Sequence, residues 1–182
     1  MTIVLPAPAA IAIRVLDREA ACDLEALALG SGLPTLEDRA HLLDLLACRG
    51  VLGAFAGDQL VGCACVARDV AKPYLDTEGR RRPLPLPNAY LCGAYVRAGR
   101  RQQGVGAALY AARLHLARRW TSGAVVVELL GAGVPGSIHP GTLAGWRWYR
   151  RADFTMLGHT VDPDGGPVLG WPPPPQPTGG RA

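Results

Sequence analysis

The sequence predicts a single mixed α/β domain of the α+β type. The chain has 182 residues, close to the ~150 residues that a single domain takes. Its residues are 49% hydrophobic and 19% charged, a composition typical of a chain with a buried core. Segments with strand patterns alternate along the chain with segments of helical spacing, and this alternation favours helices packed against a sheet.

The first part of the chain predicts one strand and two helices. Apolar residues alternate over 11–15, which is the period-two pattern of a strand. Asp17 is placed to cap a first helix that stops at Gly30-Ser31-Gly32. The sequence Thr35-Leu-Glu-Asp38 resembles a capping box, and it predicts a second helix that closes at Gly50.

A β-hairpin is the clearest element of the sequence. Strand-like runs at 51–56 and 60–66 flank Gly57-Asp58, a dipeptide suited to a tight turn with positive φ. The next segment, 72–88, contains Arg80-Arg81-Arg82 and the closely spaced Pro83, Pro85 and Pro87, so it predicts a long loop.

The second half of the chain predicts strands that alternate with helices. A helix with one apolar face follows a buried strand, and a further strand and a shorter helix come after it. In chain order, the predicted elements are a strand at 89–96, a helix at 104–120, a strand at 124–130, a Gly/Pro loop at 131–141, a helix at 142–151 and a strand at 154–161.

Composition sets the expected domain limits and location. We expect a loose N-terminal segment at 1–10, one domain at 11–170 and a Pro/Gly-rich tail at 171–182. No run reaches the ~18 apolar residues of a membrane span, and the N-terminus lacks the basic region of a secretory signal. These features predict a cytoplasmic protein with no membrane partner.

Charge and cysteine content favour neither a nucleic-acid partner nor a metal site. Nineteen basic and fifteen acidic residues give a net charge of +4, which is compatible with an anionic ligand and argues against nucleic acid. The five cysteines show no Cys-x-x-Cys spacing, so they are interpreted as small buried thiols and no metal site is predicted.

The segment from Val96 to Leu109 carries the strongest chemical signal. A strand ends there, a turn rich in Arg, Gln and Gly follows, and an amphipathic helix begins. Unpaired amides at a helix N-terminus bind phosphate, Gly104 and Gly106 permit close approach, and Arg101 adds a charged fork. Ala107-Ala108 excludes a P-loop, and Leu109 does not fit a dinucleotide fingerprint. The pattern therefore predicts a pyrophosphate site.

Two motifs resemble those of the GNAT acetyltransferase superfamily. Arg101-x-x-Gly104-x-Gly106, after a strand that ends in Val96, is similar to its acetyl-coenzyme A signature. Downstream, Trp148-Tyr149-Arg-Arg-Ala-Asp153-Phe154 resembles its tyrosine helix and Gly-Phe pair, with Asp153 in place of glycine. The resemblance implies a mixed, mostly antiparallel central sheet of six to seven strands flanked by about four helices. It also implies that this sheet splays between the strands of Tyr95 and Val127.

The resemblance also implies a reaction and a cofactor. The expected reaction moves an acetyl group from acetyl-CoA to a primary amine of a small molecule, such as an antibiotic or amino acid, by direct attack in a ternary complex. The pantetheine arm would pair with the backbone near Val96, and Arg101 would add charge. The pyrophosphate would bind the amides of the turn, at Gln102, Gln103, Gly104, Val105, Gly106 and Ala107.

Two residues are candidates for the chemical step. Tyr149 is suited to stabilise or protonate the departing thiolate, since a free tyrosine has a pKa of about 10 and a thiol of about 8.5. Packing on an aromatic helix with Trp146 and Trp148 is the alternative explanation for this tyrosine. Glu128 lies in an otherwise apolar strand and is a candidate base, directly or through water, although an ion pair would explain it equally well. Asp69 and His139 remain alternatives for the base.

Other functions stay open at this point. The same fold could hold an acyl-CoA as a non-catalytic sensor, or use an acyl-CoA other than acetyl-CoA. The acceptor could be an amine of a protein or of an aminoacyl-tRNA, and a homodimer is compatible with the sequence. The 72–88 and 131–141 loops are expected to shape the acceptor pocket; in the first, Asp76 and Glu78 would attract a cation, and Arg80–Arg82 an acid.

Overall fold

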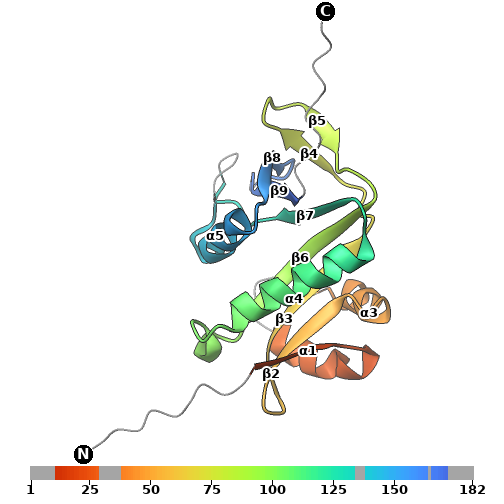
Figure 1. Cartoon of the computed structure of the whole chain (residues 1–182), viewed down its shortest axis with the longest axis vertical. Coiled ribbons are helices and arrows are strands. Elements are labelled where there is room, and N and C mark those ends of the chain that lie inside the picture. Colours follow the sequence, from red (N-terminus) through yellow and green to blue (C-terminus); the bar gives the residue numbers. More distant parts are fainter. Residues whose placement is uncertain (1–10, 29–37, 134–137, 164, 172–182) are drawn as a thin grey trace, which may run out of the picture. The chain divides into compact units, whose positions relative to one another are not determined.

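The computed structural model describes residues 11–28, 38–133, 138–163 and 165–171. These residues form two compact units (Figure 1). The first unit contains the described residues up to Ala67 together with Cys92–Leu116, and the second contains Arg68–Leu91 and the described residues from Ala117 onward. Several predicted features lie outside the described residues: 1–10, the stop at Gly30–Gly32, Thr35, part of the 131–141 loop, and 172–182.

The first unit combines an antiparallel set of strands with helices. Strand β1 pairs with β2 and β2 pairs with β3, and β6 is the next strand in the order. The elements are β1 (Ile11–Val15), η1 (Arg18–Ala20), α1 (Ala21–Ala28), α3 (Arg39–Ala47), β2 (Val51–Ala56), β3 (Gln59–Arg68), the second half of β6 (Asn88–Val96), η2 (Ala98–Arg100) and most of α4 (Val105–Trp120). The predicted strand, hairpin and helices of this region are confirmed.

Two aspartates begin the helices of the first unit. The Asp17 carboxylate accepts a hydrogen bond from the Glu19 amide at 3.1 Å, so it caps η1, which leads directly into α1. The Asp38 carboxylate accepts from the His41 amide at 3.1 Å and caps α3. Each cap satisfies an amide that has no carbonyl one turn earlier.

Helix α4 packs on the sheet of the first unit. Val105 and Leu109 are buried in one cluster with residues of β2 and β3, among them Leu52 and Val61. Gly62 permits this close packing, because a Cβ there would lie 2.8 Å from the Tyr95 carbonyl oxygen and 3.1 Å from Leu109 Cδ1. The N-terminus of α4 is thereby fixed against the strands that precede it.

The second unit is built on strands in the order β6-β7-β9-β8-β4-β5. Strands β6 and β7 are parallel, and the other pairs are antiparallel. The elements are β4 (Pro73–Asp76), β5 (Arg81–Pro83), the first half of β6, the last turn of α4, β7 (Ala124–Glu128), η3 (Pro140–Thr142), α5 (Leu143–Arg151), β8 (Thr155–Thr160) and β9 (Pro167–Trp171). Its core includes Leu84, Val126, Leu157 and Val168.

The mixed α/β class, the mostly antiparallel pairing and the four α-helices are confirmed, but the strand count is nine in the described residues. The prediction of six to seven strands missed β4 and β5, which lie in the expected 72–88 loop, and β9. Proline begins β4 and ends β5, and strand ends tolerate its missing N–H. In β9, Gly170 is needed for packing, since a Cβ there would lie 2.8 Å from Leu157 Cδ1.

Strands β6 and β7 pair over only part of their length. Their register runs from Asn88 opposite Ala124 to Leu91 opposite Val127, whereas β6 continues to Val96. Gly93 has a φ of +50°, which interrupts the extended backbone just after the last pair. The positive φ of Gly93 therefore coincides with the end of the β6–β7 pairing.

The cysteines divide into two groups. Cys63, Cys65 and Cys92 are buried, as predicted, whereas Cys22 and Cys48 are exposed, so the prediction of five buried thiols was wrong for these two. Burial raises the pKa of Cys63 to about 12 and that of Cys92 to about 11. The buried thiols therefore stay protonated and act as small apolar side chains. In the described part of the chain, no helix is long and apolar enough to cross a membrane.

Candidate functional site

The turn between β6 and α4 presents backbone amides at a helix N-terminus. The α4 helix begins at Val105, and the first hydrogen bond at its start runs from the Ala108 amide to the Gly104 carbonyl, 3.0 Å long. The amides of Val105, Gly106 and Ala107 precede that bond, so helix geometry gives them no carbonyl partner one turn earlier. Amides in this position bind anions.

Space is left open on the glycine side of the turn. Gly104 has a φ of +82°, and a Cβ at that position would meet no atom within 4 Å. A Cβ on Gly106 would meet only Val96 Cγ2, at 3.9 Å. This open position beside Gly104 is compatible with the predicted site for a pyrophosphate such as that of acetyl-CoA. The residues that would hold it are those from Gln102 to Ala107, with Gln102 itself at a φ of +62°.

Arg101 connects the turn to the end of β6. Its Nε donates to the Val96 carbonyl at 3.2 Å, and its guanidinium carbon lies 6.0 Å from the centre of the Tyr95 ring. The sequence predicts that Arg101 supplies charge to a bound anion. In the structure, Arg101 also holds the turn against the strand and keeps its charge at the surface.

Arg113 is a buried residue that the sequence analysis missed. It lies on α4, one turn after Leu109, and only 3% of its surface is exposed. Its Nη1 donates to the carbonyls of Cys92 and Gly93, at 3.4 and 3.2 Å. The side chain therefore links α4 to β6 at the position of the positive φ. The signal in the sequence that could have identified Arg113 is an arginine on the apolar face of an amphipathic helix.

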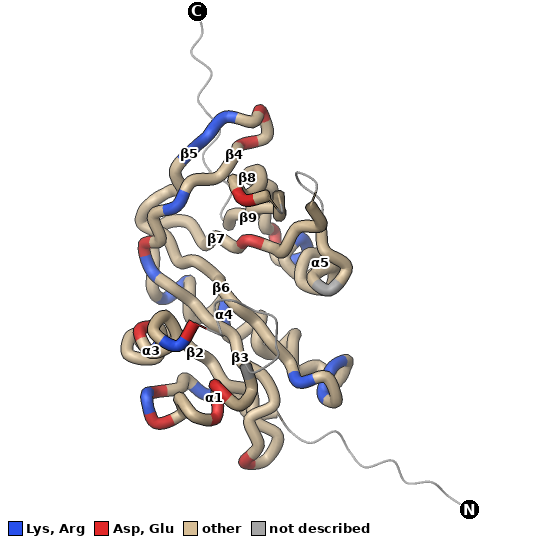
Figure 2. The backbone as a smooth tube through the Cα atoms, turned by 180° about the vertical axis from the view of Figure 1, so that it is seen from behind, with Lys and Arg blue, Asp and Glu red and all other residues tan. Residues whose placement is uncertain are grey.

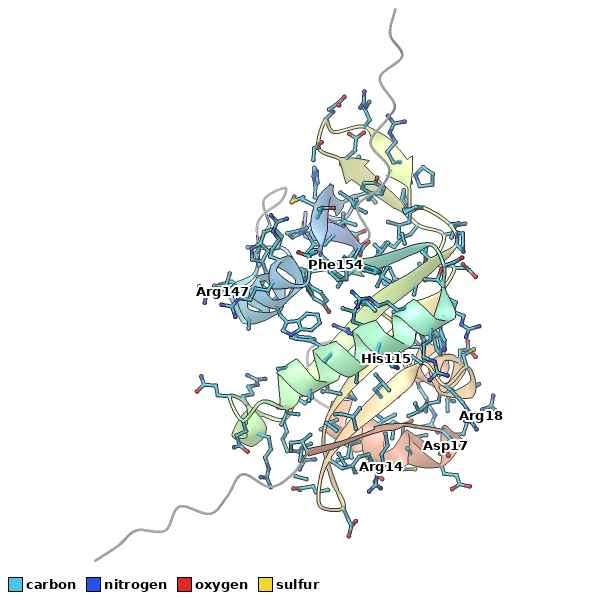
Figure 3. All side chains as sticks on the ribbon, viewed as in Figure 1. Arg14, Asp17, Arg18, His115, Arg147 and Phe154 are labelled. Carbon is cyan, nitrogen blue, oxygen red and sulfur yellow. The ribbon has the colours of Figure 1, made fainter. Side chains whose placement is uncertain are left out.

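Tyr149 lies on the buried face of α5. It is 1% exposed, and its ring packs edge-on against Phe154, with 5.0 Å between ring centres. In Figure 3, Phe154 lies beside α5, while Arg147 is on the outer side of the same helix. The tyrosine and the phenylalanine of this sequence motif are thus in direct contact.

Asp153 adopts the conformation that glycine usually supplies. Its φ is +63°, and the Phe154 amide donates to the Tyr149 carbonyl at 3.0 Å. This is the Schellman ending of a helix, in which the residue after the cap is left-handed. Asp153 therefore preserves the turn that orients Phe154 toward Tyr149, in spite of its departure from the family glycine.

Replacing Asp153 with glycine is expected to stabilise the protein. Glycine adopts a left-handed backbone without the steric cost that a Cβ brings, so we expect a gain of about 0.5–1 kcal/mol and a rise in Tm of about 1–4 °C. Thermal denaturation of Asp153→Gly measures the effect, with Asp153→Ala as the matched variant that should lower Tm. A lower Tm for the glycine variant than for wild type would contradict the argument.

Glu128, the candidate base, forms an ion pair that the sequence analysis left open as an alternative. Its Oε2 lies 2.6 Å from Lys72 Nζ, and the Glu128 side chain is 13% exposed. Its other oxygen, Oε1, is buried and has no hydrogen-bond partner in the described part of the chain. Lys72 Nζ also lies 5.6 Å from the centre of the Tyr90 ring. The structure thus brings together Lys72, Glu128 and Tyr90.

The two alternative bases, Asp69 and His139, lie in segments that connect secondary-structure elements. The Asp69 carboxylate accepts from the Asn88 amide at 3.1 Å, which closes the segment between β3 and β6. His139 is joined to the end of the preceding segment through its amide, which donates to the Leu130 carbonyl at 2.9 Å. Its carbonyl accepts from the Thr142 hydroxyl at 2.9 Å. No group of three or more metal-ligating side chains is found among the described residues.

Strand β6, the turn after it and the long helix α4 form the part of the fold in which the anion site is predicted. The chain matches the Acetyltransferase (GNAT) family over residues 18–139. It therefore belongs to the GNAT acetyltransferases, and it is an acetyl-CoA-dependent acyltransferase.

Solved structures share this fold. The arginine/ornithine succinyltransferase subunit AI of Pseudomonas aeruginosa is 15% identical, with a TM-score of 0.67 over 88% of this chain and 76% of that chain. Arabidopsis thaliana Naa50, in complex with the bisubstrate analogue CoA-Ac-MVNAL, is 14% identical, with a TM-score of 0.59 over 88% and 96%. Mycobacterium tuberculosis Rv2747, in complex with CoA and NLQ, is 14% identical, with a TM-score of 0.55 over 83% and 75%. Among curated proteins, none matches this chain.

Proposed function

We propose that this enzyme transfers an acetyl group from acetyl-CoA to a primary amine of a small molecule, by direct attack while both substrates are bound. The observation that carries the proposal is the turn before α4, where the first amides of the helix have no helical partner and a Cβ on Gly104 would meet no atom within 4 Å. Membership of the GNAT family supports acetyl-CoA as the donor. The cytoplasmic location and a homodimer remain predictions.

Each candidate residue has a separate role in this proposal. Acetyl-CoA supplies an activated thioester when it is bound. The amides of residues 102–107 hold its pyrophosphate, and the backbone near Val96 pairs with its pantetheine arm. Glu128 Oε1 accepts a proton from the attacking amine, directly or through water, because Oε2 is already bound to Lys72. Tyr149 stabilises the thiolate that departs.

A thiol-release assay with a panel of amines tests the proposal. We expect release of CoA thiol with at least one small amine and the matching N-acetyl product by mass spectrometry. Cys22 and Cys48 are exposed and react with thiol reagents, so a blank without amine is needed. Turnover with peptides alone would assign a protein acceptor. A steep salt dependence with charged tRNA would assign a nucleic-acid acceptor, and tight CoA binding without turnover would assign a sensor.

Replacing Glu128 with glutamine is expected to lower kcat/KM by about 100-fold or more, since a general base contributes on that order. The amide keeps the shape of the side chain but does not accept a proton from the amine. The measurement is the initial rate with saturating acetyl-CoA and varied amine over a range of pH.

Lys72→Met is the matched variant for Glu128→Gln. It removes the same ion pair but keeps the carboxylate, so a base role predicts a much smaller loss of rate than in Glu128→Gln. Equal losses of kcat/KM in the two variants, together with equal falls in Tm, would show that Glu128 acts only as a structural ion-pair partner of Lys72.

A further inference from the structure

A hollow with a cationic lining lies at the β4–β5 hairpin in the second unit. It is an open depression of about 400 Å³, and three of its lining residues are the cations Lys72, Arg81 and Arg82. Its other lining residues are alanine, proline and leucine, and no carboxylate is among them. The run of blue along β5 in Figure 2 marks the basic part of this hairpin. We name this space the hairpin hollow.

The acidic residues of the hairpin are already engaged. The Asp76 carboxylate accepts from the Arg80 amide at 2.9 Å and from Arg80 Nε and Arg82 Nε, at 3.2 and 3.1 Å. These bonds lower its pKa to about 2, with the Arg80 amide as the main cause, so Asp76 stays ionised. Glu78 pairs with Arg80. The carboxylates that would attract a cationic amine are therefore bound to arginines of their own hairpin.

Arg81 is left with a charge that no acid in the described residues neutralises. Four cations and two acids lie between Lys72 and Arg82, and Arg81 forms no ion pair in the described part of the chain. A guanidinium offers parallel donors that match a carboxylate. In the sequence, the 72–88 loop is compatible with either a cationic or an acidic ligand. The ion pairs in the structure favour the acidic ligand.

Lys72 connects the hairpin hollow to the proposed chemistry. It lines the hollow, and its Nζ lies 2.6 Å from Oε2 of Glu128, the proposed base. The base acts on the acceptor amine and not on the acetyl group. A ligand group held beside Lys72 is for this reason expected to belong to the acceptor.

We propose that the hairpin hollow binds a carboxylate of the acceptor, with Arg81 as its main charged contact. The acceptor is then an amine that also carries an acid, as an amino acid does, and not a polycation such as a polyamine. This inference rests on the proposed function and names the substrate class of the same site. The other group with the same chemistry is a carboxylate on the acyl group of the donor.

Matched acceptors test the proposal. Each amino acid is paired with its carboxamide, which keeps the amine and shape but loses the charge. We expect the acid to exceed the amide in kcat/KM by about 10- to 100-fold, mainly through KM, because a charged hydrogen bond is worth that much. In Arg81→Gln this ratio should fall to near one, and Arg81→Lys should restore part of it. Arg119→Gln, which removes an exposed arginine on α4, should leave the ratio as in wild type.

The outcomes separate this inference from the proposed function. Turnover with equal rates for acids and amides, or an unchanged ratio in Arg81→Gln, overturns the hairpin hollow as a carboxylate site and leaves the enzyme intact. A third outcome is that, with a neutral amine, the wild type prefers a dicarboxylic acyl-CoA over acetyl-CoA and Arg81→Gln loses this preference. This outcome overturns the acceptor as the source of the carboxylate. If no amine is turned over, calorimetry with an N-acetyl amino acid decides: weaker binding to Arg81→Gln than to wild type supports the site, and equal binding overturns it.

Discussion

Replacing Gly104 with aspartate is expected to abolish measurable CoA binding. Two effects add up. The φ of +82° is strained for any residue with a Cβ, at a cost of about 1–3 kcal/mol, and the new carboxylate repels the pyrophosphate in the space that is now open. Together they predict a loss of affinity of about 100-fold or more, measured by calorimetry with CoA.

Two matched variants separate strain from charge. Gly99→Asp adds the same carboxylate in η2, where a Cβ meets no atom within 4 Å and the backbone is not left-handed. It should retain most of the affinity for CoA. Gly106→Ala introduces only an ordinary contact with Val96, so it should fold normally, and any loss of CoA affinity reports the approach of the ligand to the backbone. Wild-type affinity in Gly104→Asp would refute the pyrophosphate site.

Replacing Tyr149 with phenylalanine is expected to lower kcat by about 100-fold while leaving the KM for acetyl-CoA almost unchanged. The hydroxyl acts on the thiolate only as it departs, and acid catalysis of this kind contributes on that order. The ring contacts of Tyr149 with Trp148 and Phe154, at 5.3 and 5.0 Å between centres, are available to phenylalanine as well. Initial rates of thiol release give both constants.

A packing control accompanies Tyr149→Phe. Phe154→Leu disturbs the same aromatic contact but keeps the hydroxyl, so it should lower Tm more than it lowers kcat. If Tyr149→Phe has the kcat of wild type, the tyrosine is a packing residue of α5 and the thiolate is stabilised by another group.

The sequence predicts best the elements whose signals are local. The hairpin at Gly57-Asp58, the cap at Asp17 and the helix that begins after Gly104 depend on neighbours a few residues away, and each is present in the structure. Strands β4 and β5 were missed because their pairing is set by Asp76, whose carboxylate binds two backbone amides and two arginines within its own turn. Proline content conceals such a hairpin from a pattern of apolar residues.

The same distinction applies to the candidate site: its local features can be predicted from the sequence, and its long-range contacts cannot. The turn from Arg101 to Ala107 is one continuous segment, so its spacing alone indicates an anion site. The partner of Glu128 is Lys72, 56 residues earlier in the chain, and no periodicity relates positions so distant in sequence. Arg113 was missed for another reason. Its burial depends on two carbonyls of β6, and the residue pattern along α4 gives no information about that strand.

The bonds from Arg113 to the carbonyls of Cys92 and Gly93 join the helix that starts at the anion-binding turn to the strand that precedes it. Within the first unit, these two segments are therefore joined before any ligand arrives. A flexible turn would lose conformational entropy each time it binds a ligand. Here that ordering is completed when the chain folds, so more of the binding free energy remains available to hold the donor.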